Sequence, residues 1–235
     1  MKPYYSESGV EIYHADAREL VSELDFDSVI TDPVWPNAAV PLAGHSDPHG
    51  LLSQVLMGCS AAARVAIQLG CDSDSRFTTA VPAIWPFFRV AWLEMARPHY
   101  KGRLMYGSDV AYLFGAPPQS RKGAHVIPGR FIDADSSGRQ SDHPCPRKLN
   151  TVAWLVRWWS EPTDTILDPF CGSGTTLVAA KNKGRKAIGI EVEERYCAMA
   201  AERLRQEVFD FPTEPCTDAA TSGVSQISGN MGVEK

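Results

Sequence analysis

The feature that most constrains this sequence is a strand–helix–strand–helix unit near its C-terminal end. The two strands are Thr165–Leu167 and Ala187–Ile190, and the two helices are Thr175–Lys183, which Gly184 ends, and Glu193–Glu207. Such alternation is typical of a parallel sheet covered by helices. Ligands of these sheets bind at the carboxyl ends of the strands, so functional residues are expected where each strand ends.

The rest of the chain adds elements of the same kind. Short β-like runs are present at Val10–Tyr13, Ser28–Thr31 and Arg64–Leu69, and apolar residues three and four apart predict helices over Pro86–Ala96 and Thr151–Trp159. We therefore predict an α/β fold of three layers with a mostly parallel sheet.

A glycine loop connects the first strand of the unit to its first helix. Asp168-Pro169-Phe170-Cys171-Gly172-Ser173-Gly174-Thr175-Thr176 contains two glycines, which allow a tight turn and close approach of a ligand. Leu177 occupies the position of the third glycine of a dinucleotide fingerprint, and a Walker loop would require Lys after its last glycine. The loop therefore satisfies neither phosphate-binding motif.

The carboxylates beside this loop suggest another ligand. Asp168 could pair with a cationic amino group, and the loop amides could bind a carboxylate, so an amino-acid end fits both. Glu191 ends the next strand, where an acid can accept hydrogen bonds from both ribose hydroxyls. An amino acid joined to a nucleoside describes S-adenosylmethionine. The alternative is a glycine turn capped by an aspartate.

The segments DPFCGSGTT and AIGIEVEERYCAMAAERL resemble the cofactor-binding half of DNA amino-methyltransferases, which methylate N6 of adenine or N4 of cytosine. The resemblance implies the Rossmann-like fold of S-adenosylmethionine-dependent methyltransferases. It also implies a set of cofactor-binding residues: Asp168, Phe170, Cys171, Gly172, Ser173, Gly174, Thr175 and Glu191.

The catalytic element of the same family resembles Thr31-Asp32-Pro33-Val34-Trp35, which directly follows a predicted strand. Asp32 and the carbonyl of Pro33 are both acceptors that could hold the two hydrogens of a base amine, and Trp35 offers a flat face for a flipped base. Val34 departs from the family's second proline. The alternative is a strand ended by an Asp-Pro turn with a core tryptophan.

Two shorter matches extend the resemblance. Asp16, in Tyr13–Ala17, matches the acid that contacts the cofactor adenine, although it could instead be an ordinary helix cap for residues 17–24. His143 lies in His143-Pro144-Cys145-Pro146-Arg147, which resembles the HP-x-x-K/R element that lines the cofactor pocket. Because the Asp32 element precedes the glycine loop, the motif order resembles the permuted, beta-type arrangement.

Charge is distributed unevenly along the chain. The total is −5, but Arg97–Lys148 contains nine basic and four acidic residues, so that stretch is +5 and the remainder is −10. We predict a catalytic domain over residues 1–210 and a disordered tail at 211–235. The resemblance to the beta-type order implies a target-recognition insert at 115–142, and the basic charge of this region suits contact with phosphates. The alternative for the basic stretch is a solvated surface loop.

The predicted function is transfer of a methyl group from S-adenosylmethionine to N6 of adenine in double-stranded DNA, at a specific site and with the base flipped out, as in restriction–modification systems. In the family that the chain resembles, Ser at the catalytic position leans toward cytosine, so Asp32 favours adenine. The alternatives are N4 of cytosine, a protein or RNA substrate, and an inactive cofactor- or DNA-binding module.

The remaining expectations concern the setting of the enzyme. A short recognition region and a palindromic target predict a homodimer. Six separate cysteines, no apolar run long enough to span a membrane and no apolar leader at Met1–Tyr5 predict a cytoplasmic protein. His45 and His49 are four residues apart with Asp47 between them, but the sequence has no second paired group of ligands and no CxxC pair, so no metal is expected.

Overall fold

A computed structural model describes residues 1–35, 43–44, 46–119, 128–133 and 148–206. Its centre is a nine-stranded sheet in the order β1-β2-β9-β8-β3-β4-β6-β5-β7. The strands are β1 (Tyr5–Glu7), β2 (Val10–His14), β3 (Ser28–Thr31), β4 (Arg64–Gly70), β5 (Phe87–Lys101), β6 (Leu104–Gly115), β7 (Arg130–Asp133), β8 (Thr165–Asp168) and β9 (Lys186–Glu191).

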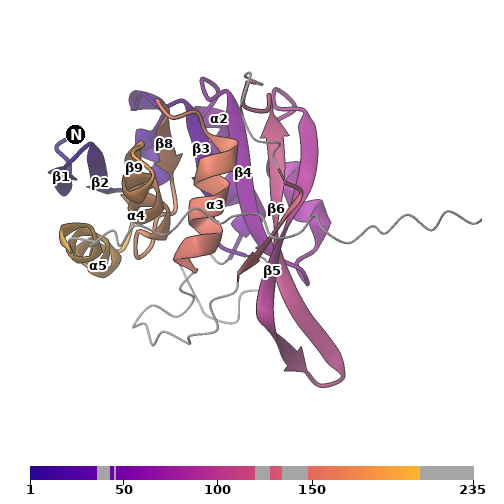
Figure 1. The fold of residues 1–235 in the computed structure, drawn as a ribbon. Helices are drawn as coiled ribbons and strands as arrows, with labels where there is room; N and C mark the ends of the chain where they lie inside the picture. The colour runs from indigo at the N-terminus through magenta and orange to yellow at the C-terminus, as the bar shows by residue number, and fades with distance from the viewer. Residues whose placement is uncertain (36–42, 45, 120–127, 134–147, 207–235) are drawn as a thin grey trace, which may run out of the picture.

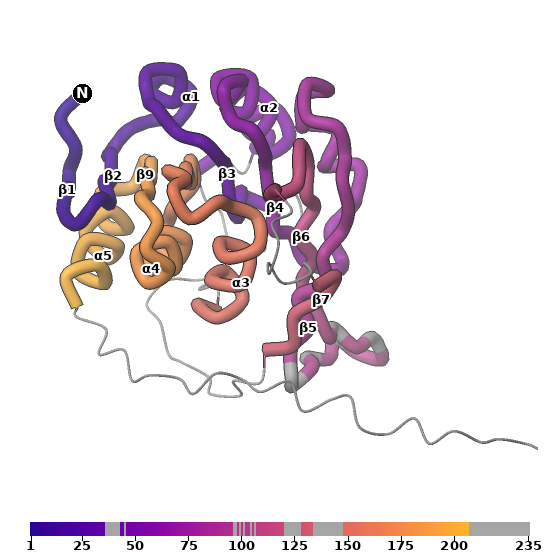
Figure 2. The backbone as a smooth tube through the Cα atoms, turned by 45° about the horizontal axis from the view of Figure 1, so that its top comes forward, coloured from indigo at the N-terminus to yellow at the C-terminus, as the bar shows by residue number. Residues whose placement is uncertain are grey.

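Helices cover both faces of this sheet (Figures 1 and 2). They are α1 (Ala17–Leu20), α2 (Pro48–Gly58), α3 (Leu149–Trp159), α4 (Thr175–Asn182) and α5 (Glu194–Arg205), with short 3-10 helices at Val21–Glu23 and Ser75–Ala80. Figure 2 shows α1 and α2 on one side and α3, α4 and α5 on the other. Two separate clusters of buried side chains occupy these two interfaces. The predicted three-layer α/β fold is confirmed.

The five central strands, β2, β9, β8, β3 and β4, are parallel, whereas β1, β6 and β5 each pair antiparallel with a neighbour. Central parallel strands are covered by helices on both faces, and their sequences are therefore nearly continuous apolar runs. All seven residues of β4 are buried in this way. The strands predicted at residues 10–13, 28–31, 64–69, 165–167 and 187–190 are all present.

The helix predicted over Pro86–Ala96 is wrong, because this stretch forms most of β5. Ala91 and Leu93 point into the core beside α3, whereas Trp92 between them is 51% exposed. This alternation is the period of a strand, and an apolar run of this length also satisfies a helical spacing. Antiparallel pairing with the whole of β6 decides in favour of the strand.

The parallel strands bring five chain segments to one edge of the sheet. His14 pairs with Glu191, Asp168 with Gly189, and Thr31 with Ile67, so the carboxyl ends of β2, β9, β8, β3 and β4 lie along the same edge. Residues that follow strands far apart in the sequence are thereby collected in one place. Of the predicted insert at 115–142, only 115–119 and 128–133 are described. The tail at 211–235 lies outside the described residues.

Candidate active site

A pocket of about 540 Å³ opens along the carboxyl edge of the sheet. It is lined from β3 by Asp32 and Pro33, from β8 by Asp168 and from β9 by Glu191, and helix α3 contributes Val152 and Leu155. Its volume is in the range of pockets that hold small ligands. The predicted catalytic residues and most of the predicted cofactor residues therefore share one cavity.

The glycine loop between β8 and α4 packs tightly against α5. Gly174 has φ +79°, and a Cβ on it would lie 2.7 Å from Cβ of Ala200, so both its conformation and its surroundings require glycine. From α5, the guanidinium of Arg203 donates to the carbonyl and hydroxyl of Ser173 at 2.7 and 3.1 Å and to Oγ1 of Thr175 at 3.1 Å. The side chains of Ser173 and Thr175 therefore help to fix the loop.

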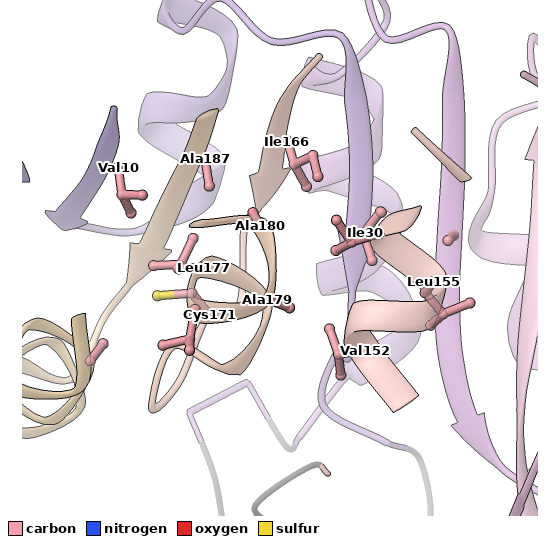
Figure 3. Close-up of a cluster of buried hydrophobic side chains, with 14 of the residues drawn as sticks. Val10, Ile30, Val152, Leu155, Ile166, Cys171, Leu177, Ala179, Ala180 and Ala187 are labelled. Atoms are coloured by element: carbon pink, nitrogen blue, oxygen red, sulfur yellow. The ribbon is translucent and has the colours of Figure 1, made fainter. Parts of the chain in front are cut away.

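Cys171 is directed into the core and not into open space. It is 5% exposed and belongs to the buried cluster shown in Figure 3, where it lies close to Leu177. A Cβ on Gly189 would lie 2.7 Å from Cδ1 of Leu177 and 2.8 Å from Sγ of Cys171. Burial raises the pKa of Cys171 far above that of a free thiol. Its side chain serves packing, although the residue also lines the pocket.

Asp168 is a buried carboxylate with several donors. Its Oδ1 accepts from the hydroxyl of Thr31 at 2.8 Å and from the amide of Phe170 at 3.2 Å, and the Thr176 hydroxyl also donates to the carboxylate. Burial raises the pKa of Asp168 to about 6, the hydrogen bonds oppose that rise, and the nearby charge of Asp32 adds to it. The group is ionised at neutral pH, where it favours a cationic ligand.

Glu191 is held by two backbone amides. Gly172 donates to its Oε2 and Glu193 to its Oε1, both at 2.9 Å. Burial raises its pKa, and these two hydrogen bonds lower it. Each oxygen of an ionised carboxylate has a second acceptor position, so Glu191 can still accept from a pair of ribose hydroxyls. The amide of Gly172 is thus engaged with Glu191.

Asp16 combines two roles. It is the N-cap of α1 and accepts a hydrogen bond from the backbone amide of Arg18 at 2.9 Å. Its carboxylate also forms an ion pair with the guanidinium of Arg18 at 2.5 Å. The hydrogen bond from Arg18 holds the pKa of Asp16 below its usual range. The cap considered from the sequence is therefore present, and Asp16 also lines the pocket beside Glu191.

The Asp32 element leaves β3 at the rim of the pocket. The indole Nε1 of Trp35 donates to Oδ1 of Asp32 at 2.7 Å, and Pro33, Val34 and Trp35 all line the cavity. A Cβ on Gly70, the last residue of β4, would lie 2.5 Å from Cζ3 of Trp35. Gly70 therefore leaves the space in which the indole ring lies, and the ring orients Asp32.

Several residues in and around the pocket are not among those predicted from the sequence. Thr31 and Thr176 hold Asp168, and Gln68 donates to Asp109 at 3.2 Å while lining the pocket. Thr31 has a sequence signal, since it is the last residue of a strand and precedes Asp32. Gln68, in the middle of an apolar run, marks a buried polar group that needs a partner. Gly70 and Arg203 have no local signal.

His143 lies outside the described residues, so its place relative to the pocket stays a prediction. Within the described part of the chain, no three His, Cys, Asp or Glu side chains are grouped as metal ligands would be. None of the helices in the same residues is long and apolar enough to cross a membrane.

The pocket suits S-adenosylmethionine. Ionised Asp168 can bind the amino group, Glu191 can bind the ribose, and the apolar side chains of Phe170 and Ile190 offer surface for the adenine. Asp32 lies in the same cavity, so a base bound there would be next to the cofactor.

The chain is similar in sequence to known DNA methyltransferases. The family model for DNA methylases, N6_N4_Mtase, matches residues 83–202, about half of the chain. The type II methyltransferase M.ScaI of Streptomyces caespitosus is 27% identical over 88% of this chain and 84% of its own. M.HinfI of Haemophilus influenzae is 53% identical over 72 residues, which are 31% of this chain and 20% of that protein.

Solved structures show the same fold. The M1.HpyAVI–SAM complex superposes with a TM-score of 0.65 at 23% identity, covering 84% of this chain and all of that one. The PvuII DNA methyltransferase, described as cytosine-N4-specific, has a TM-score of 0.66 at 16% identity and covers 88% and 90% of the two chains. With its S-adenosylmethionine-dependent methyltransferase fold and its family match, the chain belongs to the N6/N4 family of DNA methyltransferases.

Proposed function

We propose that this DNA methyltransferase transfers its methyl group to N6 of adenine in double-stranded DNA. The observation that carries the proposal is the arrangement of Asp32, whose Oδ1 is held by the Trp35 indole at 2.7 Å in the same pocket as Asp168 and Glu191. A carboxylate acceptor is thereby presented next to the cofactor residues. Curated relatives named type II methyltransferases support methylation at specific sites.

The residues of the chain have distinct roles in this proposal. A base amine is a poor nucleophile because its lone pair is delocalised into the ring. Asp32 and the Pro33 carbonyl accept the two amine hydrogens, which directs the lone pair away from the ring plane and toward the methyl group. Asp32 can also receive the proton that the nitrogen loses as the new N–C bond forms.

The cofactor residues position the other reactant. When bound, S-adenosylmethionine supplies a methyl group activated by its sulfonium. Asp168 holds the amino end and Glu191 the ribose, so that the two reactants meet in line. The cluster of Asp32, Asp168 and Glu191 favours a cationic cofactor over its neutral product.

A flipped base needs a surface to lie against. Trp35 lines the pocket, with its N–H bonded to Asp32 and its six-membered ring over Gly70. We propose that the indole both orients the carboxylate and forms one wall of the base site. Val34, in place of the family's second proline, leaves both acceptors and the aromatic ring in place.

The test of the catalytic assignment is Asp32→Ala, with Asp32→Asn as the conservative partner. Tritium transfer from labelled S-adenosylmethionine to unmethylated genomic DNA is expected to fall on the order of 10²–10³-fold in Asp32→Ala. The affinity for S-adenosylhomocysteine, measured by calorimetry, is expected to stay within about twofold because Asp32 acts on the amine. Loss of cofactor affinity in step with activity would contradict the assignment.

Cytosine N4 is the second candidate target. The fold neighbour described as cytosine-N4-specific supports it, and a cytosine amine also carries two hydrogens that Asp32 and Pro33 could accept. The choice of adenine rests on the carboxylate at position 32, since the family's Ser at this position leans toward cytosine. Nucleoside analysis of methylated DNA decides, and N4-methylcytosine without N6-methyladenine would overturn the choice.

We also propose that the enzyme acts as a homodimer. On the outer face of β5 and β7, Trp92 and Ile132 are each 51% exposed, whereas Leu93 and Phe131 on the opposite face pack toward α3. An exposed apolar face beside a short edge strand supports contact with a second subunit. Sedimentation measures the oligomeric state of the full chain. The same measurement on Trp92→Glu, which places a charge on the proposed contact face, tests whether this face forms the dimer.

A further inference from the structure

The hairpin of β5 and β6 extends well past the edge that carries the pocket. β4 ends at Gly70, which pairs with Asp109 of β6, but β6 begins five residues earlier at Leu104, opposite Lys101 of β5. At the usual rise per residue, the hairpin projects about 15 Å beyond the carboxyl end of β4. Figure 1 shows this projection at the bottom of the view. We call residues 95–108 the arm.

The arm differs in charge from the body of the protein. Between Glu94 and Asp109 the sequence contains Arg97, Lys101 and Arg103 and no acid, which makes the arm +3 in a chain whose total is −5. Its tip is a two-residue turn at Gly102 and Arg103, with Gly102 at φ +63°. Arg103 is exposed at this turn, so its guanidinium is available to a polyanion.

The arm also presents apolar groups on one face. Tyr100 and Met105 are paired directly across the two strands and are 70% and 62% exposed. Since side chains alternate along β6, Met105 lies on the same face as Gly107 and Asp109. Asp109 accepts a hydrogen bond from Gln68, which lines the pocket. The exposed pair therefore lies on the side of the sheet that continues into the active site.

The segment before the tip explains how the arm leaves the sheet. The pairing of β5 with β6 shifts between Glu94 and His99, where four residues of β5 lie opposite Gly107 of β6, and Pro98 falls within this irregular stretch. Bulges bend a strand and increase its twist, and proline is accepted there because no ladder hydrogen bond is lost. The arm is thus a bent extension and not a simple continuation of the sheet.

We propose that the arm binds the DNA duplex beside the flipped base. Arg103 at its tip would contact backbone phosphates, and Tyr100 and Met105 would pack on the sugars or base edges of the same groove. This rests on the proposed function, because a base in the pocket fixes where its duplex must lie. The expected insert at 115–142 begins elsewhere, since Gly115 pairs with Arg64 at the amino end of β4.

The test compares two variants that each remove two positive charges. Lys101→Ala/Arg103→Ala alters the arm, and Lys183→Ala/Lys186→Ala alters two exposed lysines near the amino end of β9, on the opposite edge of the sheet. Binding to a labelled duplex is measured by fluorescence anisotropy at several salt concentrations, together with methyl transfer. The affinity for S-adenosylhomocysteine and the melting temperature report on folding.

For the arm variant, we expect roughly tenfold weaker duplex binding and a slope of log K against log salt that is smaller by about 2. A Tyr100→Ala/Met105→Ala variant is expected to weaken binding with little change in that slope, because it removes no charge. In all variants the cofactor affinity is expected to be unchanged. The lysine control should bind DNA as the unaltered enzyme does.

Two results would overturn the proposal in different ways. If the unaltered enzyme methylates DNA and both arm variants match the lysine control, the arm has no role in binding and the proposed function stands. If the unaltered enzyme neither binds nor methylates any duplex, the proposed function fails and the arm proposal fails with it.

Discussion

Asp168 and Glu191 end two neighbouring parallel strands and Asp32 directly follows a third, yet each carboxylate is held by a different kind of donor. The Trp35 indole holds Asp32, the Thr31 hydroxyl is among the donors to Asp168, and the backbone amides of Gly172 and Glu193 hold Glu191. Burial raises the pKa of the last two. Because Asp168 and Glu191 both line the cofactor pocket, a fall in pH is expected to weaken cofactor binding before it destabilises the fold.

The affinity for S-adenosylhomocysteine is expected to depend on the protonation of Asp168. Its pKa of about 6 means that the carboxylate is ionised above that pH, when it can pair with the ligand's amino group. As pH falls below about 6, affinity should decline by up to about tenfold per pH unit, because binding then requires loss of a proton. Calorimetric titrations from pH 5 to 8 measure this decline.

Asp168→Asn provides the control for that experiment. The variant should bind the ligand more weakly at pH 8 and lose most of the pH dependence, and any remaining slope belongs to Glu191. A raised pKa in the folded state means that ionisation disfavours folding, so the cofactor-free variant should be at least as stable as the unaltered enzyme at pH 8. An unchanged slope in Asp168→Asn would refute the assignment.

Gly70→Ala is expected to reduce catalysis through Trp35. The new Cβ would meet Cζ3 of Trp35 at 2.5 Å, so the indole must move and its hydrogen bond to Asp32 must change. We expect kcat to fall roughly tenfold with unchanged affinity for S-adenosylhomocysteine. Steady-state kinetics with saturating DNA measure the effect.

A second substitution separates this effect from general disruption. Trp35→Phe removes both the indole N–H and the ring atoms nearest to Gly70, so it should lower kcat by itself. If Gly70 acts through the indole, Gly70→Ala should cause little further loss in the Trp35→Phe background. Additive losses would show that Gly70 acts independently of Trp35.

At the scale of elements, an ion pair joins the end of β7 to the start of α3. Nζ of Lys148, the N-cap residue of α3, lies 3.3 Å from Oδ2 of Asp133, the last residue of β7, which is 2% exposed. The two residues are adjacent in the fold although 14 residues separate them in the sequence. This pair therefore fixes where the chain leaves the sheet and where it enters the helix layer.

Lys148→Met is expected to destabilise the fold by about 1–2 kcal/mol. The substitution keeps most of the aliphatic stem but removes the ammonium group that lies 3.3 Å from a buried carboxylate, and the partial exposure of Lys148 limits the loss. Urea denaturation followed by circular dichroism measures the change. Lys186→Met, at an exposed position, is the matched control.

The double variant Asp133→Asn/Lys148→Met tests the cause. With the side chain of residue 133 also neutral, the desolvation penalty of its buried charge disappears, so part of the lost stability should return. A double variant that is less stable than Lys148→Met alone would show that Asp133 acts through another partner.

At the scale of the whole molecule, the sheet carries two different surfaces at one edge. The cofactor pocket is lined by carboxylates, whereas the arm beside it is basic. The total of −5 hides this separation, since a local field and not the net charge attracts a polyanion. A cationic cofactor and an anionic substrate can therefore be bound side by side.

Cofactor binding is expected to stabilise the whole fold, because the pocket is built from β3, β8, β9 and α3 together. At a ligand concentration of 100 Kd, the stabilisation is about 2.7 kcal/mol. For a chain of this size, S-adenosylhomocysteine should then raise Tm by roughly 5–10 °C. NAD at the same concentration should cause no shift, since Leu177 breaks the dinucleotide fingerprint. Differential scanning fluorimetry measures both.

Asp168→Ala is the control for the thermal shift. It should lose most of the stabilisation by S-adenosylhomocysteine, because the amino group of the ligand no longer has its partner. A shift with NAD equal to that with S-adenosylhomocysteine would contradict the pocket described above.

The sequence alone determined the five central strands, the glycine loop and the identity of the cofactor, because these depend on residues close together in the chain. Asp168 beside Gly172 and Gly174, and Glu191 after the next strand, carry their meaning in local spacing. The order of the Asp32 element and the glycine loop is also a property of the sequence. The match to the family model confirms that the chain belongs to the family that these motifs predicted.

Only the tertiary structure decided that residues 86–96 lie mostly in a strand and which residues bond to the carboxylates of the site. The strand β5 exists because β6 pairs with it, and the apolar run itself satisfies either period. In the same way, Thr31 meets Asp168 and Trp35 meets Gly70 only through pairing of β3 with β8 and β4. Local patterns specify elements, whereas contacts between distant residues depend on how the strands assemble, and strand order is not encoded in spacing.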